Sequence, residues 1–328
     1  MGYFNPFKDM IFDDRFCFLS GKLTTERMPV FPEWLMKHFG LEDEKLSLME
    51  NRQVKMVAYQ DLKLPCTTAV KQAFEKLDAQ FKKAYESGFE GMAELDEEVI
   101  FQWSGRIVYG LLYLEFVGEW ERCQRLGKAF KIAPNLQDRL GKFHLMLQSV
   151  IHPISFGENK PWSIIVFPLK YSADILSYRD DIINLLFQFG VNGFGFIVSF
   201  MDNGIVKEKE RRLLENMKGH ILHPIQFEEL FARFHYDVDL LQYLPRYVIE
   251  KDTNPLKIEA IPITQTDPEK PVFGLWIDDF YARLLSNYWQ VYGIEKGDII
   301  RFQEPFLSFL ENPHTKEFID PESIELPF

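Results

Sequence analysis

Cysteine is scarce in this sequence of 328 residues, which contains only Cys17, Cys66 and Cys123. An odd and sparse set differs from the dense, even framework of small secreted proteins that rely on disulfides. The sequence therefore favours a reducing compartment, and we expect a cytoplasmic protein. The first 14 residues also lack the basic start and unbroken apolar stretch of a signal peptide, so export is not expected.

Basic residues are in the minority. The chain has 37 lysines and arginines against 49 aspartates and glutamates, which gives a net charge of -12. An acidic protein repels a phosphate backbone unless a local basic patch overrides the overall charge. We therefore do not expect nucleic acid as a partner.

Long apolar stretches are also missing. The most apolar segment, 99–117, is interrupted by Gln102, Arg106 and Glu115. A charge near the middle of a bilayer costs about 3 kcal/mol on insertion scales. The segment therefore predicts a buried core helix, and we expect no membrane association.

Hydrophobic residues make up 46% of the chain and aromatic residues 15%, which is enough to build a sizeable core. Apolar spacing and capping residues predict a helix-rich α+β fold. The expected helices are 33–39, 67–85, 136–150, 174–189, 227–243 and 275–291, together with a core helix capped by Asp96. The first of them is expected to end at Gly40.

Strand signals are concentrated in the second half of the chain. Two short β-rich runs, 162–169 and 193–200, bracket the expected helix 174–189. The turn residues 201–204 follow, and Ile205 is expected to begin a hairpin partner strand. An edge strand is expected at 256–263, so this region predicts a small mixed or antiparallel sheet with helices.

These patterns predict three parts in the chain. The first, 1–92, contains a small hairpin within 16–31 and the first two helices. The second, 93–155, is helical, and the third, 156–328, is an α+β region without a readable chemical motif.

Three segments of the first part resemble the HNH endonuclease family, in the type whose fold is held by a zinc ion on two cysteine pairs. That family has a Cys-x-x-Cys-Gly turn, a Glu-His pair before an apolar-apolar-Pro-x-Trp-Leu run, and a Pro-Cys-x-x-Cys-Asn sequence leading into a helix. The corresponding segments here are 17–21 (CFLSG), 30–35 (VFPEWL) and 65–70 (PCTTAV). The resemblance covers about residues 15–85 and implies a zinc-ribbon-like hairpin followed by helices.

The resemblance also implies that the zinc site is degenerate. Cys17 and Cys66 keep one ligand of each pair, whereas Ser20 and Ala69 stand where the other two cysteines would be. Structural zinc requires four nitrogen or sulfur donors, so we expect no metal and no cofactor. Apolar packing is then expected to replace the stabilisation that zinc supplies.

The catalytic positions of the family are changed as well. Counted back from Pro32, its Glu-His pair falls on Met28 and Pro29, and neither side chain can accept a proton. A small shift of register brings Glu26 and Arg27 to these places, but arginine cannot act as a base. No catalytic residue is therefore assigned.

Other residues that could take part in catalysis or metal binding have ordinary structural explanations. Pairs that could bind metal or act as a nucleophile and base lack further ligands or local support: His220 with His223, Glu115 with Glu119, and Cys66 or Cys123 with His144. The run 193–195 begins a strand and lacks a Gly-Lys-Thr element, so it does not predict a phosphate loop. The mixed-charge run 207–212 predicts a solvated helix face.

We therefore expect a non-catalytic binding or scaffold protein derived from an HNH-like ancestor, with a protein partner or a second copy as its possible partner. One alternative is a divergent metal-dependent nuclease whose ligands lie elsewhere. The other alternative is a small-molecule binder that uses the sheet expected at 162–204.

Overall fold

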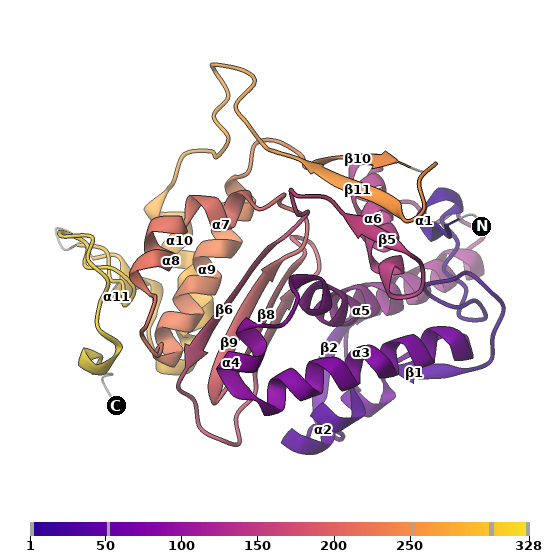
Figure 1. The fold of residues 1–328 in the computed structure, drawn as a ribbon, viewed down its shortest axis with the longest axis horizontal. Coiled ribbons are helices and arrows are strands. Elements are labelled where there is room, and N and C mark those ends of the chain that lie inside the picture. The colour runs from indigo at the N-terminus through magenta and orange to yellow at the C-terminus, as the bar shows by residue number, and fades with distance from the viewer. Residues whose placement is uncertain (1–2, 51–52, 251, 302–304, 326–328) are drawn as a thin grey trace. The chain divides into compact units, whose positions relative to one another are not determined.

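The protein has the predicted α+β architecture, in which helices and small sheets occupy separate stretches of the chain (Figure 1). A computed structural model describes residues 3–50, 53–250, 252–301 and 305–325. The chain divides into two compact units. Unit 1 contains 1–86, 95–157 and 249–258, and unit 2 contains 87–94, 158–248 and 259–328. Unit 1 thus combines most of the predicted parts 1–92 and 93–155.

Unit 1 is mainly helical. Its helices are α1 (Pro6–Asp9), α2 (Glu33–Phe39), α3 (Thr68–Glu86), α5 (Glu97–Arg125) and α6 (Pro134–Leu147). Local signals set their ends: α2 stops at Gly40 in the left-handed conformation, and the Asp96 side chain accepts a hydrogen bond from the Glu98 amide at 2.8 Å. The predicted boundaries of α2, α3 and α6 and the predicted start of α5 are confirmed to within a few residues, whereas α1 was not predicted.

Helix α5 forms the centre of unit 1. Its residues from Val99 to Tyr113 are all buried, which confirms the predicted core helix. Arg106 is only 1% exposed and forms two hydrogen bonds with Asp78 of α3, at 2.8 and 3.0 Å. No helix among the described residues is both long and apolar enough to cross a membrane.

Short strands complete unit 1. Strand β1 (Arg27–Pro29) pairs antiparallel with β4 (Lys63–Pro65), and β2 (Lys45–Glu50) pairs antiparallel with β3 (Gln53–Ala58). Within the hairpin expected at 16–31, the ladder is limited to a bridge between Phe16 and Leu23.

A three-stranded sheet has the order β10 (Arg246–Glu250), β11 (Leu256–Ile261), β5 (Ile154–Phe156). Strand β11 confirms the strand expected at 256–263. Its place between β10 and β5 makes the prediction of an edge strand wrong.

Unit 2 is built on a four-stranded antiparallel sheet with the order β6 (Ser163–Leu169), β9 (Gly193–Ser199), β8 (Leu186–Val191), β7 (Ser177–Asp181). Its helices are α4 (Gly88–Ala93), α7 (Ile205–Lys209), α8 (Arg211–Asn216), α9 (Pro224–Leu240), α10 (Asp278–Trp289) and α11 (Lys296–Ile299). Helix α9 confirms the predicted amphipathic helix.

The helix predicted at 174–189 is wrong, because this segment forms β7 and β8. The Asp181 carboxylate accepts hydrogen bonds from the backbone amides of Ile183 and Asn184, at 2.8 and 2.9 Å, and so closes a turn between the two strands. In β8 Gln188 points to the opposite face of the sheet from Phe187 and Phe189, and all three side chains are buried.

The strand predicted from Ile205 is also wrong. Gly204 adopts a φ of 77°, and the Asp202 carboxylate accepts hydrogen bonds from the amides of Gly204 and Val206, at 3.1 and 3.2 Å. These bonds satisfy amides that a helix start leaves free, so the turn at 201–204 leads into α7.

Helix α9 packs on the sheet of unit 2, where two glycines admit an aromatic ring (Figure 1). A Cβ atom on Gly190 would lie 2.3 Å from the Phe227 ring, and one on Gly195 would lie 3.2 Å from it. The close approach buries Phe227 completely and positions the charged residues of α9.

Candidate functional site

Residues 17–21 form a tight turn around the sulfur of Cys17. The Ser20 amide donates a hydrogen bond to Cys17 Sγ at 3.4 Å, and the Gly21 amide donates one to the Cys17 carbonyl at 2.9 Å. Gly21 has a φ of 66°, and a Cβ at this position would lie 2.3 Å from the Phe4 ring. The turn therefore requires glycine and directs the Ser20 N–H at the cysteine sulfur.

Backbone hydrogen bonds attach the segment that contains Cys66 to this turn. The Phe18 amide donates to the Pro65 carbonyl at 2.8 Å, and the Cys66 amide donates to the Glu26 carbonyl at 3.1 Å. Both thiols are buried and free. Burial, together with the neighbouring Cys17, raises the pKa of Cys66 to about 12, so its thiol stays protonated at neutral pH.

The other two positions offer little to a metal. The Ser20 hydroxyl oxygen is buried and has no hydrogen-bond partner, and Ala69 lies exposed in the first turn of α3. Nowhere in the described part of the chain do three His, Cys, Asp or Glu side chains gather so that they could hold a metal ion. The structure thus brings Cys17, Ser20 and the Cys66 segment together, and Ala69 supplies no donor.

The positions that correspond to the catalytic pair lie beside a cavity of about 310 Å³ in unit 1. Met28 and Pro29 belong to β1 and line this cavity with Trp34 of α2 and Arg106 of α5. The indole N–H of Trp34 and the Nε–H of Arg106 are buried without a hydrogen-bond partner. No histidine lines the cavity, so it lacks the imidazole base of the nuclease family.

The residues that a shifted register would use are engaged elsewhere. The Thr68 hydroxyl donates a hydrogen bond to the Glu26 carboxylate, and Arg27 forms an ion pair with Asp14 at 2.9 Å. Neither Glu26 nor Arg27 lines the cavity.

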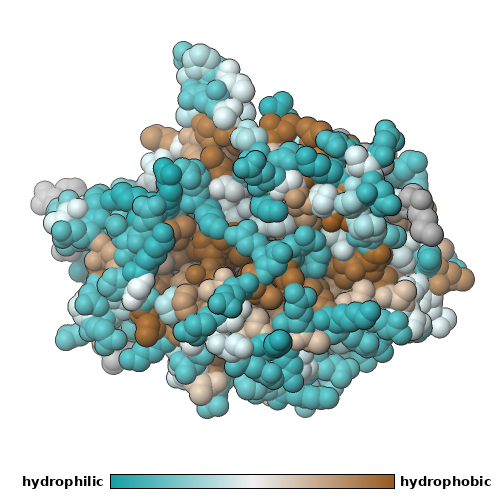
Figure 2. Space-filling view, viewed as in Figure 1, coloured by the Kyte–Doolittle hydropathy of each residue, from teal (hydrophilic) through white to brown (hydrophobic). Residues whose placement is uncertain are grey.

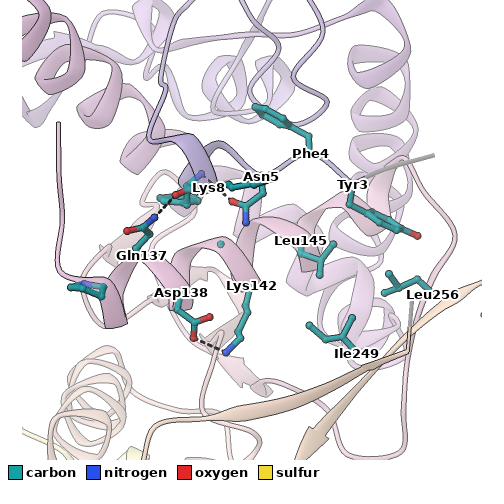
Figure 3. A pocket seen from close by; sticks show the side chains of 13 residues that line it. Tyr3, Phe4, Asn5, Lys8, Gln137, Asp138, Lys142, Leu145, Ile249 and Leu256 are labelled. Carbon is teal, nitrogen blue, oxygen red and sulfur yellow. Dashed lines mark hydrogen bonds and ion pairs between the residues drawn. The ribbon is translucent and has the colours of Figure 1, made fainter. Parts of the chain in front are cut away.

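A larger cavity of about 830 Å³ in unit 1 is mostly apolar (Figure 3). Phe4, Leu145, Ile249 and Leu256 contribute to its wall. Its charged lining residues are Lys8 of α1 and, on α6, Lys142 and Asp138, which pair at 2.6 Å. The wall thus pairs an apolar surface with one ion pair on α6 and a lysine on α1.

Helix α9 of unit 2 carries an unusual number of buried charges. Glu228, Glu229 and Asp237 are at most 2% exposed, and the side chain of Arg233 is 18% exposed. Charged groups are rarely buried without a partner, because losing their hydration is costly. Such clusters accompany functional sites more often than ordinary cores.

One face of α9 holds the C-terminal segment. Glu229 accepts hydrogen bonds from the Ser308 hydroxyl and from the amides of Phe309 and Leu310, the last two at 2.7 and 3.1 Å. Arg233 pairs with Glu311 at 3.0 Å. This face therefore owes its charges to residues about 80 positions further along the chain.

Another face of α9 meets the sheet. Glu228 pairs with Arg179 of β7 at 2.7 Å and accepts a hydrogen bond from the Ser177 hydroxyl at 3.2 Å. Burial raises the pKa of Glu228, although Arg179 opposes this effect. These contacts attach α9 to β7 of the sheet.

The run 207–212 is mostly exposed, as predicted for a solvated face, but Glu210 is buried and several of its charges pair with other segments. Lys209 pairs with Asp237, and Glu210 is 8% exposed and lies 3.4 Å from Arg233. Arg212 pairs with Glu311 at 2.6 Å. The α9 face had a detectable signal, since Glu229, Arg233 and Asp237 recur every four residues, but sequence alone does not show that other segments cover them.

The remaining candidates have structural roles. His223 caps α9 by accepting a hydrogen bond from the Ile225 amide at 3.2 Å, and Glu119 pairs with Arg122. His144 and Cys123 are buried in unit 1. Gly193 and Gly195 lie in β9.

No protein-family model, curated protein sequence or solved structure matches this chain.

Proposed function

We propose that the chain is a non-catalytic binding protein whose N-terminal region descends from an HNH-like zinc module. One observation carries this proposal: the Cys17 turn and the Cys66 segment adjoin, while Ser20 and Ala69 replace two of the four sulfur ligands. Amide hydrogen bonds to sulfur are a feature of turns that present cysteine to a metal. Two thiols and a hydroxyl fall short of the four nitrogen or sulfur donors that structural zinc requires.

Apolar packing supports the turn in place of a metal. Phe18 is fully buried and stacks on Phe74 of α3, with ring centroids 6.0 Å apart. Its ring also lies 6.1 Å from Tyr113 of α5. Aromatic contacts of this kind contribute about 1 kcal/mol each beyond their buried area. The free, buried cysteines fit a protein that acts in a reducing compartment such as the cytoplasm.

A protein partner or a second copy is the binding mode that the surface favours. Figure 2 shows apolar side chains gathered in several places on the visible face. The hairpin β2–β3 exposes Met49, Val54 and Met56 by 48%, 67% and 53%. Apolar side chains on an exposed hairpin are suited to contact with another protein surface.

Metal analysis and a cleavage assay test the proposal against the nuclease alternative. The purified chain should contain no stoichiometric zinc by mass spectrometry, and it should not cleave plasmid DNA with magnesium or manganese. The matched control is Cys17→Ser/Cys66→Ser, which removes both remaining thiols. Stoichiometric zinc, or cation-dependent cleavage that this variant loses, would contradict the proposal.

The small-molecule alternative was expected to use the sheet at 162–204, but cavities outside this sheet support it better. In the sheet of β6 to β9, strands β6, β8 and β9 are almost completely buried and β7 is mostly half-buried, and none of the four lines a cavity described above. Cavities lie instead beside α9 in unit 2 and beside α1 and α6 in unit 1.

A further inference from the structure

The cavity of about 830 Å³ in unit 1 has a polar side and an apolar side. Figure 3 shows Asn5, Asp138 and Lys142 in its left half, and Leu145 and Ile249 in its right half. The volume of the cavity falls within the range of sites that bind small molecules. A wall divided in this way suits a ligand that has one polar end and one apolar end.

The apolar side keeps part of its surface open to a ligand. Leu145 of α6 and Ile249 of β10 are half-buried, and so are the rings of Tyr3 and Phe4 that line the same cavity. The Tyr3 ring packs edge-on against His152, with ring centroids 5.4 Å apart, which holds it in place. Because removing apolar surface from water is favourable, a hydrocarbon chain that covers this side would stabilise a complex.

The polar side has two hydrogen-bond donors that are available to a ligand. Asn5 Oδ1 accepts from the Phe7 amide at 3.0 Å, whereas Asn5 Nδ2 has no hydrogen-bond partner among the described residues. In the same part of the chain, Lys8 Nζ has neither a hydrogen-bond partner nor an ion-pair partner. Asn5 and Lys8 are both exposed and both line the cavity, so a ligand there can reach their side chains.

The charges that line the cavity leave one positive charge without a counter-charge. Lys142 is neutralised by Asp138 at 2.6 Å, and Asp9, the acidic residue of α1, does not line the cavity. A cationic head group would be repelled by Lys8, and a doubly charged phosphate would need a second free cation. A head group with a single negative charge, such as a carboxylate that accepts from both Lys8 and Asn5, therefore fits best.

We propose that this cavity binds a fatty acid. Its carboxylate lies at Lys8 and Asn5, and its hydrocarbon chain lies along Leu145 and Ile249. The free donors and the single surplus charge select the head group, while the open apolar side selects the chain. The inference concerns unit 1 alone and does not depend on the origin of the turn at Cys17.

Isothermal titration of the full chain with soluble ten-carbon probes tests both ends of the ligand. Decanoate should bind, and it should bind more tightly than 1-decanol or decyltrimethylammonium, which carry the same chain on a neutral and on a cationic head group. Octanoate should bind about 15-fold more weakly than decanoate, because each CH₂ group removed from water changes the affinity about fourfold. These comparisons measure the head group and the chain separately.

Two variants locate the ligand in the cavity. Lys8→Gln should weaken decanoate about fivefold, the usual upper effect of an exposed ion pair, and leave 1-decanol unchanged. Leu145→Gln should weaken decanoate and 1-decanol alike. The matched control Lys37→Gln removes an exposed lysine of α2 that pairs with Glu33 and lies outside the cavity, so it should leave both affinities unchanged.

Each other outcome overturns the proposal. If decanoate does not bind, or if 1-decanol or decyltrimethylammonium binds more tightly, the ligand class is wrong. If decanoate binds equally well to wild type and to Lys8→Gln, the site lies elsewhere. Because the Lys8 side chain is exposed and unpaired among the described residues, Lys8→Gln without ligand should unfold at the same urea concentration as wild type, which verifies that the variant is folded.

Discussion

Acidification from pH 7 to pH 5 should destabilise the protein through His144. This side chain is completely buried in α6, and its Nδ1 lies 3.3 Å from the Tyr109 hydroxyl. Its Nε2 has no hydrogen-bond partner, and no described carboxylate is bonded to the ring. Burial therefore lowers the pKa of His144 to about 3.

The sign and size of the effect follow from the two states. The unfolded chain binds a proton at this imidazole below about pH 6.5, whereas the folded protein does not bind it until the pH approaches 3. The free energy of unfolding therefore falls as the pH falls through this window, by about 1.4 kcal/mol per pH unit. Between pH 7 and pH 5 the loss due to His144 is about 2 kcal/mol.

Urea unfolding of wild type and His144→Gln at both pH values measures this loss. Asp202, whose pKa burial raises to about 6, acts in the opposite direction, because its folded form binds the proton more tightly than the unfolded chain does. That contribution is the same in both proteins and cancels in the comparison. Wild type should lose about 2 kcal/mol more than the variant between pH 7 and pH 5. Equal losses in the two proteins would refute the reasoning.

Two further substitutions test the packing of each unit, with unfolding in urea as the measurement. Gly190→Ala places a methyl group against Phe227 and should lower the free energy of unfolding by about 1–3 kcal/mol. The control Gly297→Ala has no atom within 4 Å of the new Cβ and should not lower it. Equal losses in the two variants would contradict the close approach of Gly190 and Phe227. Asp78→Ala leaves the buried Arg106 guanidinium unpaired and should cost about 3 kcal/mol, while Asp78→Leu/Arg106→Met should recover most of this loss. If the double variant is as unstable as the single one, the pair is not the cause.

The helices of unit 1 could be predicted because their end signals are local. Gly40 and Asp96 act on residues within one turn of themselves, so the sequence shows them directly. The strands β7 and β8 could not be predicted in the same way. Both faces of β8 are buried, and a short apolar run of that kind looks the same in a helix and in a strand.

The two candidate sites also differ in how much of each the sequence reveals. The turn at Cys17, for which we propose an origin in a zinc site, depends on spacing within Cys17–Gly21 and on Cys66, which the sequence displays. The charged face of α9 in unit 2 depends on contacts such as Glu229 with Leu310 and Arg233 with Glu311, which form only in the folded chain. An amphipathic helix normally turns its charges to solvent, so nothing local indicates that a C-terminal segment covers them.

Rebuilding the lost ligands tests the central claim most directly. Ser20→Cys/Ala69→Cys restores four thiols at the proposed positions, and this variant should bind one zinc ion per chain and give the absorption of tetrahedral thiolates with cobalt. The matched control, Ser20→Cys/Ala73→Cys, has the same number of thiols but moves the fourth one turn along α3. Tight zinc binding by the first variant and not by the second is the predicted result. If neither variant binds zinc, or if both bind it equally, the turn at Cys17 is not the remnant of a zinc site.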